Sequence, residues 1–342
     1  MTDALQLAQE VLSGEEAWVV GGAVRDELLG RPVVDLDIAC RAPEGAARAY
    51  ARRTGGAVFP LSTEHGGWRV ALDEARTVDF TPLQGGSIEA DLGTRDFTIN
   101  AIAVPLAGGD AIDPFGGRAD LQRRVIRVVS PTIFDDDPLR LLRAVRLEDE
   151  LGFRLDAQSE RLVRERAPLA GGSAGERTLD ELRRLSADGF ERLADLGLLE
   201  PLGGSVSPRL RAFDSSAYRL AVTFGRNLRR LPISNELRRF TDTLLRAEPP
   251  ADGSPRAIHR FRRATEPWAL EALAYLGADE HAEAVRTARE REPAEPLVRG
   301  DELGVAPGPE VGRLLELVAE EQAAGTISTK EEALELVRRS LG

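Results

Sequence analysis

The sequence of 342 residues predicts an α+β protein, in which a sheet-forming N-terminal region is followed by helices. In the first 130 residues, short runs of β-branched and aromatic residues alternate with glycine-rich turns, a pattern typical of strands. From Asp136 onward, apolar residues recur every three or four positions, as in Leu139, Leu142 and Val145. We therefore expect a mixed sheet first and helices afterwards.

The strands are expected in six segments. In chain order, these are residues 18–20, 33–38, 68–72, 77–81, 97–104 and 125–129. Stretches rich in glycine, proline and serine predict chain breaks near residues 130–131, 202–208 and 248–255. The domains that we predict are residues 1–130, 131–202 and 203–342.

Composition excludes several classes of protein. No run of 18 or more apolar residues is long enough to span a bilayer, so no membrane association is expected. The N-terminus has no basic and apolar signal segment, and we expect a cytoplasmic protein. One cysteine and three histidines exclude an intrachain disulfide and a thiolate metal cluster, and disfavour a histidine-built metal site. Any metal ion should therefore be bound by carboxylates.

Charge is unevenly distributed. The whole chain has a formal charge of −12, but residues 209–263 contain thirteen arginines and five acidic residues. A basic segment in an acidic protein is suited to a polyanionic partner that docks at one place. The alternative is a set of solvated helix faces.

Gly21 and Gly22 follow an apolar strand and precede a helical segment that contains Arg25. Glycines let the backbone approach a ligand closely, and the amides that begin a helix favour phosphate oxygens. When this segment is taken alone, a tight strand-to-helix turn explains it better than a ligand site does. The spacing is not that of the dinucleotide-binding fingerprint.

Asp35 and Asp37 lie two residues apart in an otherwise apolar predicted strand, so their side chains should share a face. Neighbouring carboxylates repel each other unless a cation lies between them, and hard oxygen ligands suit Mg²⁺. The pair therefore predicts a two-metal site of the kind that catalyses in-line displacement at phosphorus. An exposed acidic turn is the alternative for this pair alone.

Five ordered segments together resemble one family, the class II branch of the DNA polymerase β-like nucleotidyltransferases. This branch comprises CCA-adding tRNA nucleotidyltransferases and bacterial poly(A) polymerases. The segments are VVGGAVRDELLGRPVVDLDIA (19–39), SIEADLGTRDFTINAIA (87–103), DPFGGRADLQRRVIR (113–127), DDPLRLLRAVRLEDELGF (136–153) and GERTLDEL (175–182). Residues 304–338 also resemble the tail of many bacterial members. The resemblance implies a nucleotidyltransferase head with a mixed sheet, followed by an all-α neck, body and tail.

The resemblance also assigns roles in the head. It implies that Gly21, Gly22 and Arg25 bind the triphosphate and that Asp35 and Asp37 hold the metal ions. Asp79 matches a third acidic position and would help to deprotonate the RNA 3′-hydroxyl, although an aspartate on an edge strand that faces water is the alternative. The implied reaction is attack of that hydroxyl on the α-phosphate of a nucleotide, with release of pyrophosphate.

The second segment implies a ribose contact. Arg95 and Asp96 match its arginine and aspartate, and a carboxylate can accept a hydrogen bond from a ribose 2′-hydroxyl. Where the family usually has a further arginine, this chain has Thr94. A second cation at this edge of the site is therefore not expected.

The fourth segment predicts base selection. Asp137 and Arg140 lie three residues apart at a predicted helix start, so they share a face and offer an acceptor beside donors. Cytosine and adenine each present an amino donor beside a ring acceptor, whereas uracil and guanine would leave buried groups unpaired. The pair therefore predicts use of CTP and ATP. By resemblance, Arg143 and Arg146 complete the nucleotide site.

The fifth segment is interpreted as a brace for this helix, with Ser173 or Gly175 near its N-cap. The sequence thus predicts an enzyme that adds C and A to the 3′ end of tRNA with Mg²⁺. The alternatives within the family are CC-only, A-only or poly(A) addition. A noncatalytic RNA-binding protein that kept the fold is a further alternative. We expect no DNA partner, and the sequence leaves the oligomeric state open.

Overall fold

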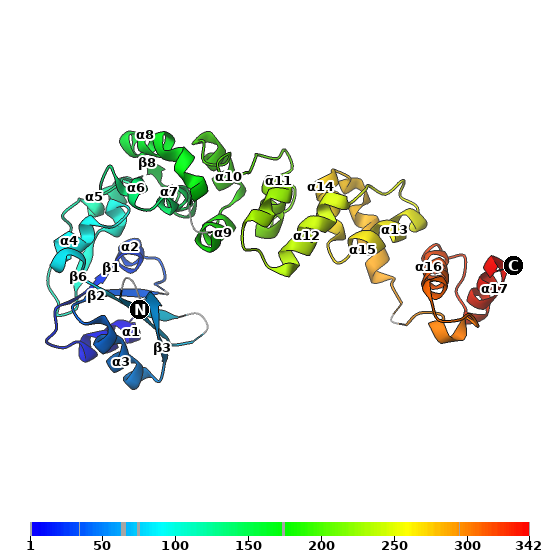
Figure 1. Cartoon of the computed structure of the whole chain (residues 1–342), viewed down its shortest axis with the longest axis horizontal. Helices are drawn as coiled ribbons and strands as arrows, with labels where there is room; N and C mark the ends of the chain where they lie inside the picture. Colours follow the sequence, from blue (N-terminus) through cyan, green and yellow to red (C-terminus); the bar gives the residue numbers. More distant parts are fainter. Residues whose placement is uncertain are drawn as a thin grey trace. The chain divides into compact units, whose positions relative to one another are not determined.

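The computed structural model describes residues 2–33, 35–62, 66–73, 76–172, 175–293 and 295–341. The chain divides into two compact units, the N-terminal unit Met1–Leu202 and the C-terminal unit Gly203–Gly342. Figure 1 shows the sheet in the N-terminal unit and the helices of both units. Among the described residues, no helix combines the length and the apolar character needed to cross a membrane.

The N-terminal unit is built on a six-stranded mixed sheet of order β3-β4-β5-β2-β1-β6. Its strands are β1 (Ala17–Val20), β2 (Leu36–Cys40), β3 (Ala57–Ser62), β4 (Gly67–Ala71), β5 (Thr77–Pro82) and β6 (Ala103–Pro105). β2 and β5 are parallel, and the other pairs are antiparallel. The register aligns four residues in one row across neighbouring strands, namely Asp37, Asp79, Arg69 and Phe59.

Helices cover the sheet unequally. α1 (Thr2–Val11) and α3 (Pro43–Thr54) lie on the face opposite the row, where Ile38, Val70 and Phe80 are fully buried. On the face of the row, α4 (Ile88–Gly93) packs over β1, β2 and β6, in a core that contains Val20 and Ala39. Cys40, at the end of β2, is also fully buried.

The predicted strands differ from the observed ones in several places: β3 (Ala57–Ser62) was not predicted, the strand expected at residues 125–129 is only Val125–Ile126, and two further differences lie at residues 97–104 and 33–38. Residues 97–104 were expected as one strand, but residues 98–100 form the 3-10 helix η2 (Thr98–Asn100), and the strand begins at Ala103. The N–H groups of Asn100 and Ala101 donate back to the carbonyls of Phe97 and Thr98, so they are not available to a neighbouring strand. β2 begins at Leu36 rather than at residue 33, and Asp35 immediately precedes it.

The rest of the N-terminal unit is mainly helical. It contains η1 (Gln84–Gly86), α2 (Gly22–Leu28), α5 (Gly117–Arg123), α6 (Ile133–Asp136), α7 (Leu139–Leu151), α8 (Ala157–Arg166), η3 (Ala167–Gly172), α9 (Gly175–Arg183) and α10 (Ala187–Asp195), and the two parallel strands β7 (Val125–Ile126) and β8 (Arg154–Leu155). α7 is central, because Leu142 and Val145 are fully buried where it packs against α9 and α10.

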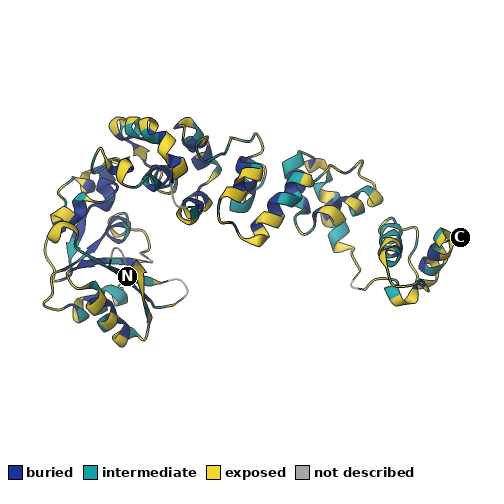
Figure 2. Ribbon diagram, in the orientation of Figure 1, coloured by how far each residue is buried: buried dark blue, intermediate teal, exposed yellow. Residues whose placement is uncertain are grey.

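Among the described residues of the C-terminal unit, the regular secondary structure is all helical, as the apolar spacing predicts. It contains α11 (Ser216–Phe224), η4 (Gly225–Arg230), α12 (Asn235–Arg246), α13 (Pro255–Thr265), α14 (Ala269–Leu276), η5 (Asp279–His281), α15 (Ala282–Glu290), η6 (Gly300–Glu302), α16 (Pro309–Ala323) and α17 (Lys330–Leu341). The hydroxyls of Ser215, Ser234 and Ser254 cap three of these helices. Figure 2 shows buried faces on these helices beside exposed ones, the amphipathic pattern that the sequence carries.

Candidate functional site

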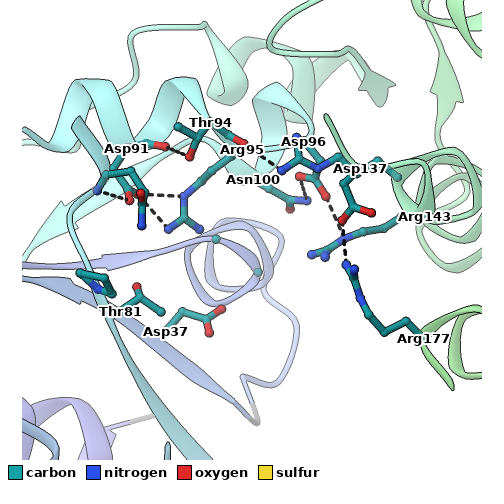
Figure 3. Close-up of a pocket in the computed structure, with 15 residues that line it drawn as sticks. Asp37, Thr81, Asp91, Thr94, Arg95, Asp96, Asn100, Asp137, Arg143 and Arg177 are labelled. Atoms are coloured by element: carbon teal, nitrogen blue, oxygen red, sulfur yellow. Dashed lines mark hydrogen bonds and ion pairs between the residues drawn. The ribbon is translucent and has the colours of Figure 1, made fainter. Parts of the chain in front are cut away.

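A cavity of about 340 Å³ opens beside the sheet of the N-terminal unit. Figure 3 shows the side chains that surround it. Those that the sequence predicts are Gly21, Gly22, Asp37, Arg95, Asp96, Asp137, Arg140 and Arg143. Those that it does not predict as ligands are Thr81, Pro82, Gln84, Asp91, Thr94, Asn100 and Arg177. The cavity therefore brings together residues from three of the five sequence segments, and Arg177 from a fourth.

The glycine turn forms one wall of the cavity. Gly21 has a φ of 73°, which favours glycine, and a Cβ atom there would lie 3.0 Å from Nη1 of Arg95 and 3.2 Å from Oδ2 of Asp37. The turn thus brings backbone close to both a guanidinium and a carboxylate. Arg25 lies behind the turn and does not line the cavity. Its Nη1 donates to Oδ1 of Asn100 at 2.8 Å.

The acidic residues gather at the ends of β2 and β5. Asp37 is paired in register with Asp79, and Asp35 precedes β2 and accepts a hydrogen bond from Oγ1 of Thr77 at 2.8 Å. Both oxygens of Asp79 accept from Arg69, each at 2.7 Å. Asp79 lies in the interior of the sheet rather than on an edge strand, so the alternative based on an edge strand is wrong.

Electrostatics at Asp37 fit a bound cation. Burial raises the pKa of Asp37, and the carboxylates of Asp79 and Asp35 raise it further, although Arg95 and Arg143 oppose them. A divalent cation would relieve this repulsion, and carboxylate oxygens are its preferred ligands. Within the described part of the chain, no three histidine, cysteine or acidic side chains converge closely enough to hold a metal ion. An ion held by Asp35 and Asp37 would therefore need oxygens from a nucleotide and from water.

Asp96 is a buried carboxylate at the centre of the cavity wall. Its Oδ1 accepts from the backbone N–H of Phe97 at 2.8 Å and from Nδ2 of Asn100 at 2.9 Å. Its Oδ2 forms an ion pair with Nε of Arg143 at 2.8 Å, but no described donor is aligned on it as a hydrogen bond. Burial alone would raise the pKa of Asp96, but Arg143, Asn100 and Phe97 together lower it. Oδ2 of Asp96 is therefore a buried, ionised oxygen with an unused capacity to accept a hydrogen bond.

Asp137 and Arg140 meet at the far end of the cavity, where α6 ends and α7 begins. Oδ1 of Asp137 accepts from the N–H of Leu139 at 3.2 Å, and its Oδ2 accepts from Nη2 of Arg177 at 2.7 Å. Nη2 of Arg140 donates to the carbonyl of Thr94 at 3.0 Å, whereas its Nη1 is buried without a described partner. Both residues line the cavity, and Nη1 of Arg140 keeps a donor that no described group uses.

The structure does not bring Arg146 to this cavity. Its guanidinium is buried and pairs with Glu150 at 2.6 Å and with Glu181 of α9. The ion pair between Arg146 and Glu181 braces α7 against α9, as the sequence interpretation of residues 176–182 expects. Gly175 begins α9, and Ser173 lies outside the described residues.

Sequence reasoning treated residues 176–182 as structural and so did not identify Arg177. The missed signal is spacing, because Arg177 and Glu181 lie four residues apart on a helix and share a face. Since Glu181 contacts α7, a residue one turn earlier should also face the α6–α7 region. Asn100 was missed because it was read as part of a buried strand.

The chain is similar to proteins of known function. Residues 17–127 match the family model described as the poly A polymerase head domain. The CC-adding tRNA nucleotidyltransferase of Thermus thermophilus is 31% identical, and the match covers 93% of this chain and 92% of that protein. The CC-adding enzyme of Geobacter sulfurreducens is 51% identical and the A-adding enzyme of Deinococcus radiodurans 46% identical. Those two matches cover only 40% and 44% of these relatives.

Solved structures share the fold over nearly the whole chain. A CCA-adding enzyme in complex with ATP has a TM-score of 0.82 at 23% identity and covers 100% of this chain and 95% of its own. The Thermotoga maritima CCA-adding enzyme in complex with tRNA has a TM-score of 0.78 at 24% identity, with 99% and 95% covered. The fold and the acidic row define the class, that of the nucleotidyltransferases. Within it, the chain belongs to the class II family of CCA-adding tRNA nucleotidyltransferases and bacterial poly(A) polymerases.

Proposed function

We propose that this protein adds C and A residues to the 3′ end of tRNA, using CTP and ATP and releasing pyrophosphate. The observation that carries the proposal is a single cavity with the acidic residue Asp37 at one end and the Asp137–Arg140 pair at the other. A nucleotide in this cavity would have its α-phosphate near Asp37 and its base near Asp137. The relatives named CC-adding and A-adding support the same chemistry.

Base selection follows from the two groups at the far end of the cavity. Asp137 can accept the amino group of cytosine or adenine, while the unpartnered Nη1 of Arg140 donates to the adjacent ring nitrogen. Uracil and guanine would set a carbonyl against the carboxylate and a ring N–H against the guanidinium. Both contacts would leave buried groups unpaired, so UTP and GTP should be poor substrates.

The remaining residues position the nucleotide. The glycine turn with Arg95 would hold the triphosphate, supported by Arg25 from behind, and Oδ2 of Asp96 would accept the 2′-hydroxyl. Asp35 and Asp37 would hold Mg²⁺, which when bound neutralises charge on the transferring phosphate. The assignment of Asp79 as a proton acceptor stays a prediction, because Arg69 engages both of its oxygens in this structure.

The test is extension of a tRNA that lacks its 3′ end, incubated with CTP, ATP and Mg²⁺. We expect extension by the wild-type protein and a loss of at least about a thousandfold in Asp35→Asn and Asp37→Asn, because both changes remove metal ligands. Nucleotide omission, with tRNAs truncated before each position of the terminal CCA, distinguishes CCA from CC-only, A-only and poly(A) addition. If the wild-type protein never extends RNA, the noncatalytic alternative gains.

A tRNA partner would need a basic surface, and the ion pairs in the structure indicate which arginines of residues 209–263 are available to form it. In the C-terminal unit, Arg256, Arg260 and Arg263 of α13 pair with acidic residues of α16. By contrast, no ion pair joins five exposed arginines to any described residue: Arg226, Arg230, Arg238, Arg239 and Arg246. We infer that these five arginines, rather than the whole basic segment, bind the RNA backbone.

A further inference from the structure

The sheet face that carries the acidic row continues into an apolar surface on its outer strands. Phe59 on β3 belongs to the same cross-strand row as Arg69, Asp79 and Asp37. Residues opposite each other in a sheet point to the same face, so the Phe59 ring lies on the side of the carboxylates. It is 43% exposed, although a large aromatic side chain is usually buried.

Leu61 extends this surface toward the cavity. It sits at a β-bulge in β3 and is 41% exposed. A Cβ atom at Gly67 would lie 3.7 Å from Cβ of Leu61 and 3.8 Å from Cγ2 of Thr81, so these three positions adjoin on one face. Because Thr81 lines the nucleotide cavity, the apolar surface of Phe59 and Leu61 is continuous with the candidate site.

The geometry of the reaction indicates that the 3′ end of the RNA would lie on this surface. This step rests on the proposed function. The β- and γ-phosphates would leave as pyrophosphate beside the glycine turn, which lies at the end of β1, on one side of Asp37. In-line displacement places the attacking hydroxyl on the opposite side of the α-phosphate. That side is occupied by β5, β4 and β3, so the 3′ end of the RNA would lie over these strands.

We propose that Phe59 and Leu61 form a stacking platform for the terminal bases of the RNA whose 3′-hydroxyl is extended. The unpaired bases at an RNA end bind to proteins by stacking on aromatic side chains, without a need for sequence readout. Arg69, which is partly exposed between Phe59 and Asp79 and is paired with Asp79, would lie beside the RNA backbone. By stacking these bases, the apolar surface would position the RNA 3′-hydroxyl for attack without discriminating between RNA sequences.

The test is a kinetic series on the full chain. We expect Phe59→Ala to raise the KM for truncated tRNA about tenfold, the loss of one stacked base, with the KM for CTP unchanged. Phe59→Tyr should restore the wild-type value and Phe59→Leu should not, because only an aromatic ring stacks. Leu169→Ala is the matched control, since this leucine is 37% exposed on η3, away from the sheet.

A direct readout separates this proposal from the proposed function. A truncated tRNA with 2-aminopurine as its last base should show altered fluorescence on binding to the wild-type protein, and a smaller change with Phe59→Ala. Equal kinetics and fluorescence for both proteins would overturn the platform while leaving RNA extension intact. If Phe59→Ala instead abolishes a dimer seen by analytical ultracentrifugation, the surface is an interface between copies and the platform is wrong. Failure of the wild-type protein to extend RNA would overturn both proposals.

Discussion

At the scale of single residues, Arg177 holds the Asp137 carboxylate, which we propose selects the base. The Asp137 carboxylate would otherwise turn freely about its χ angles, but Arg177 holds Oδ2 while the Leu139 N–H holds Oδ1. These two hydrogen bonds fix the orientation of the Asp137 carboxylate, and so they also fix the direction in which its remaining lone pairs can accept. A charge-assisted hydrogen bond of this kind orders an acceptor before the ligand arrives, which reduces the entropy lost on binding.

We expect Arg177→Ala to reduce discrimination against the wrong base. The ratio of kcat/KM for CTP over UTP should fall about tenfold, because the loosened carboxylate loses its alignment with the amino group. Single-nucleotide incorporation assays would measure it. Arg183→Ala is the control, since Arg183 lies on the same helix at 3.9 Å from Asp180. An unchanged ratio would show that Asp137 is oriented without Arg177.

Asn100 links Arg25, behind the glycine turn, to Asp96 in the cavity wall. It accepts from Arg25 and donates to Asp96, and both of these partners are buried. Asn100→Ala should therefore leave two charged groups short of one partner each. We expect a loss of about 1–3 kcal/mol in the free energy of unfolding and a higher KM for both CTP and ATP.

Thermal unfolding and steady-state kinetics would test this expectation together. Asn227→Ala provides a matched control, because Asn227 donates to the Gly203 carbonyl on the exposed surface of the C-terminal unit. A variant that lost stability but kept its KM for nucleotides would mean that Asn100 supports only the fold.

Residue by residue, the sequence predicted several residues that line the cavity, some from the chemistry of their side chains and some from the family resemblance. Asp37, Asp96, Asp137 and Arg140 carry groups that a nucleotide requires, and their segments follow a recognisable order. Arg146 continues the same three-residue spacing but turns inward to Glu181, because α9 packs on that side of α7. The spacing of a helix gives a face, but only tertiary packing decides what that face meets.

At the scale of elements, the local sequence pattern predicts strands poorly in two places, one with a proline inside a strand and one where side-chain hydrogen bonds hold a turn. β3 was not predicted, since its sequence AVFPLS contains Pro60, which weakens a strand. It is tolerated because β3 is an edge strand. Residues 98–100 have strand-like composition, yet Thr98 donates to Asp120 at 2.7 Å and Asn100 to Asp96, bonds that hold a turn.

The contact between α13 and α16 predicts a response to acid. Hydrogen bonds from Arg256 and Thr326 lower the pKa of Glu321 from 4.5 to about 2. Because the folded pKa lies below the unfolded one, the stabilisation is complete above the unfolded value and is lost as pH falls toward the folded value. Glu321→Gln should destabilise the protein by about 1 kcal/mol near neutral pH, and the difference should vanish toward about pH 2.

Urea unfolding of wild type and variant at several pH values would measure that difference. Glu335→Gln is the control, since its partners Arg338 and Arg339 lie in its own helix. A gap between wild type and Glu321→Gln that persisted unchanged at low pH would contradict the role of this ion pair.

At the scale of the whole molecule, the net charge is acidic, but the arginines of the C-terminal unit fall into two groups, those with and those without an ion-pair partner among the described residues. Arg256, Arg260 and Arg263 of α13 are exposed but form ion pairs with α16, whereas Arg238, Arg239 and Arg246 of α12 are exposed and form no ion pair with a described residue. We expect the triple variant Arg238→Ala, Arg239→Ala and Arg246→Ala to raise the KM for tRNA. It should also reduce the slope of log KM against log salt concentration by about 2. The reason is that the variant loses three phosphate contacts, so fewer counterions are released when the RNA binds.

The matched control is Arg256→Ala, Arg260→Ala and Arg263→Ala, which removes the same charge from the paired set. Its salt slope should stay close to that of the wild type, and the KM for CTP should be unchanged in both triple variants. Equal effects of the two triples would show that net charge, rather than the exposed arginines, governs the encounter with RNA.

The position of Cys40 has a practical consequence for work on this protein. Burial beneath the helices raises the pKa of this thiol to about 11, so it carries little thiolate at neutral pH. The chain should therefore tolerate air without a reductant and should form no covalent oligomers. A cysteine introduced on the surface would be the single position that a maleimide dye modifies, which makes the protein a ready subject for fluorescence labelling.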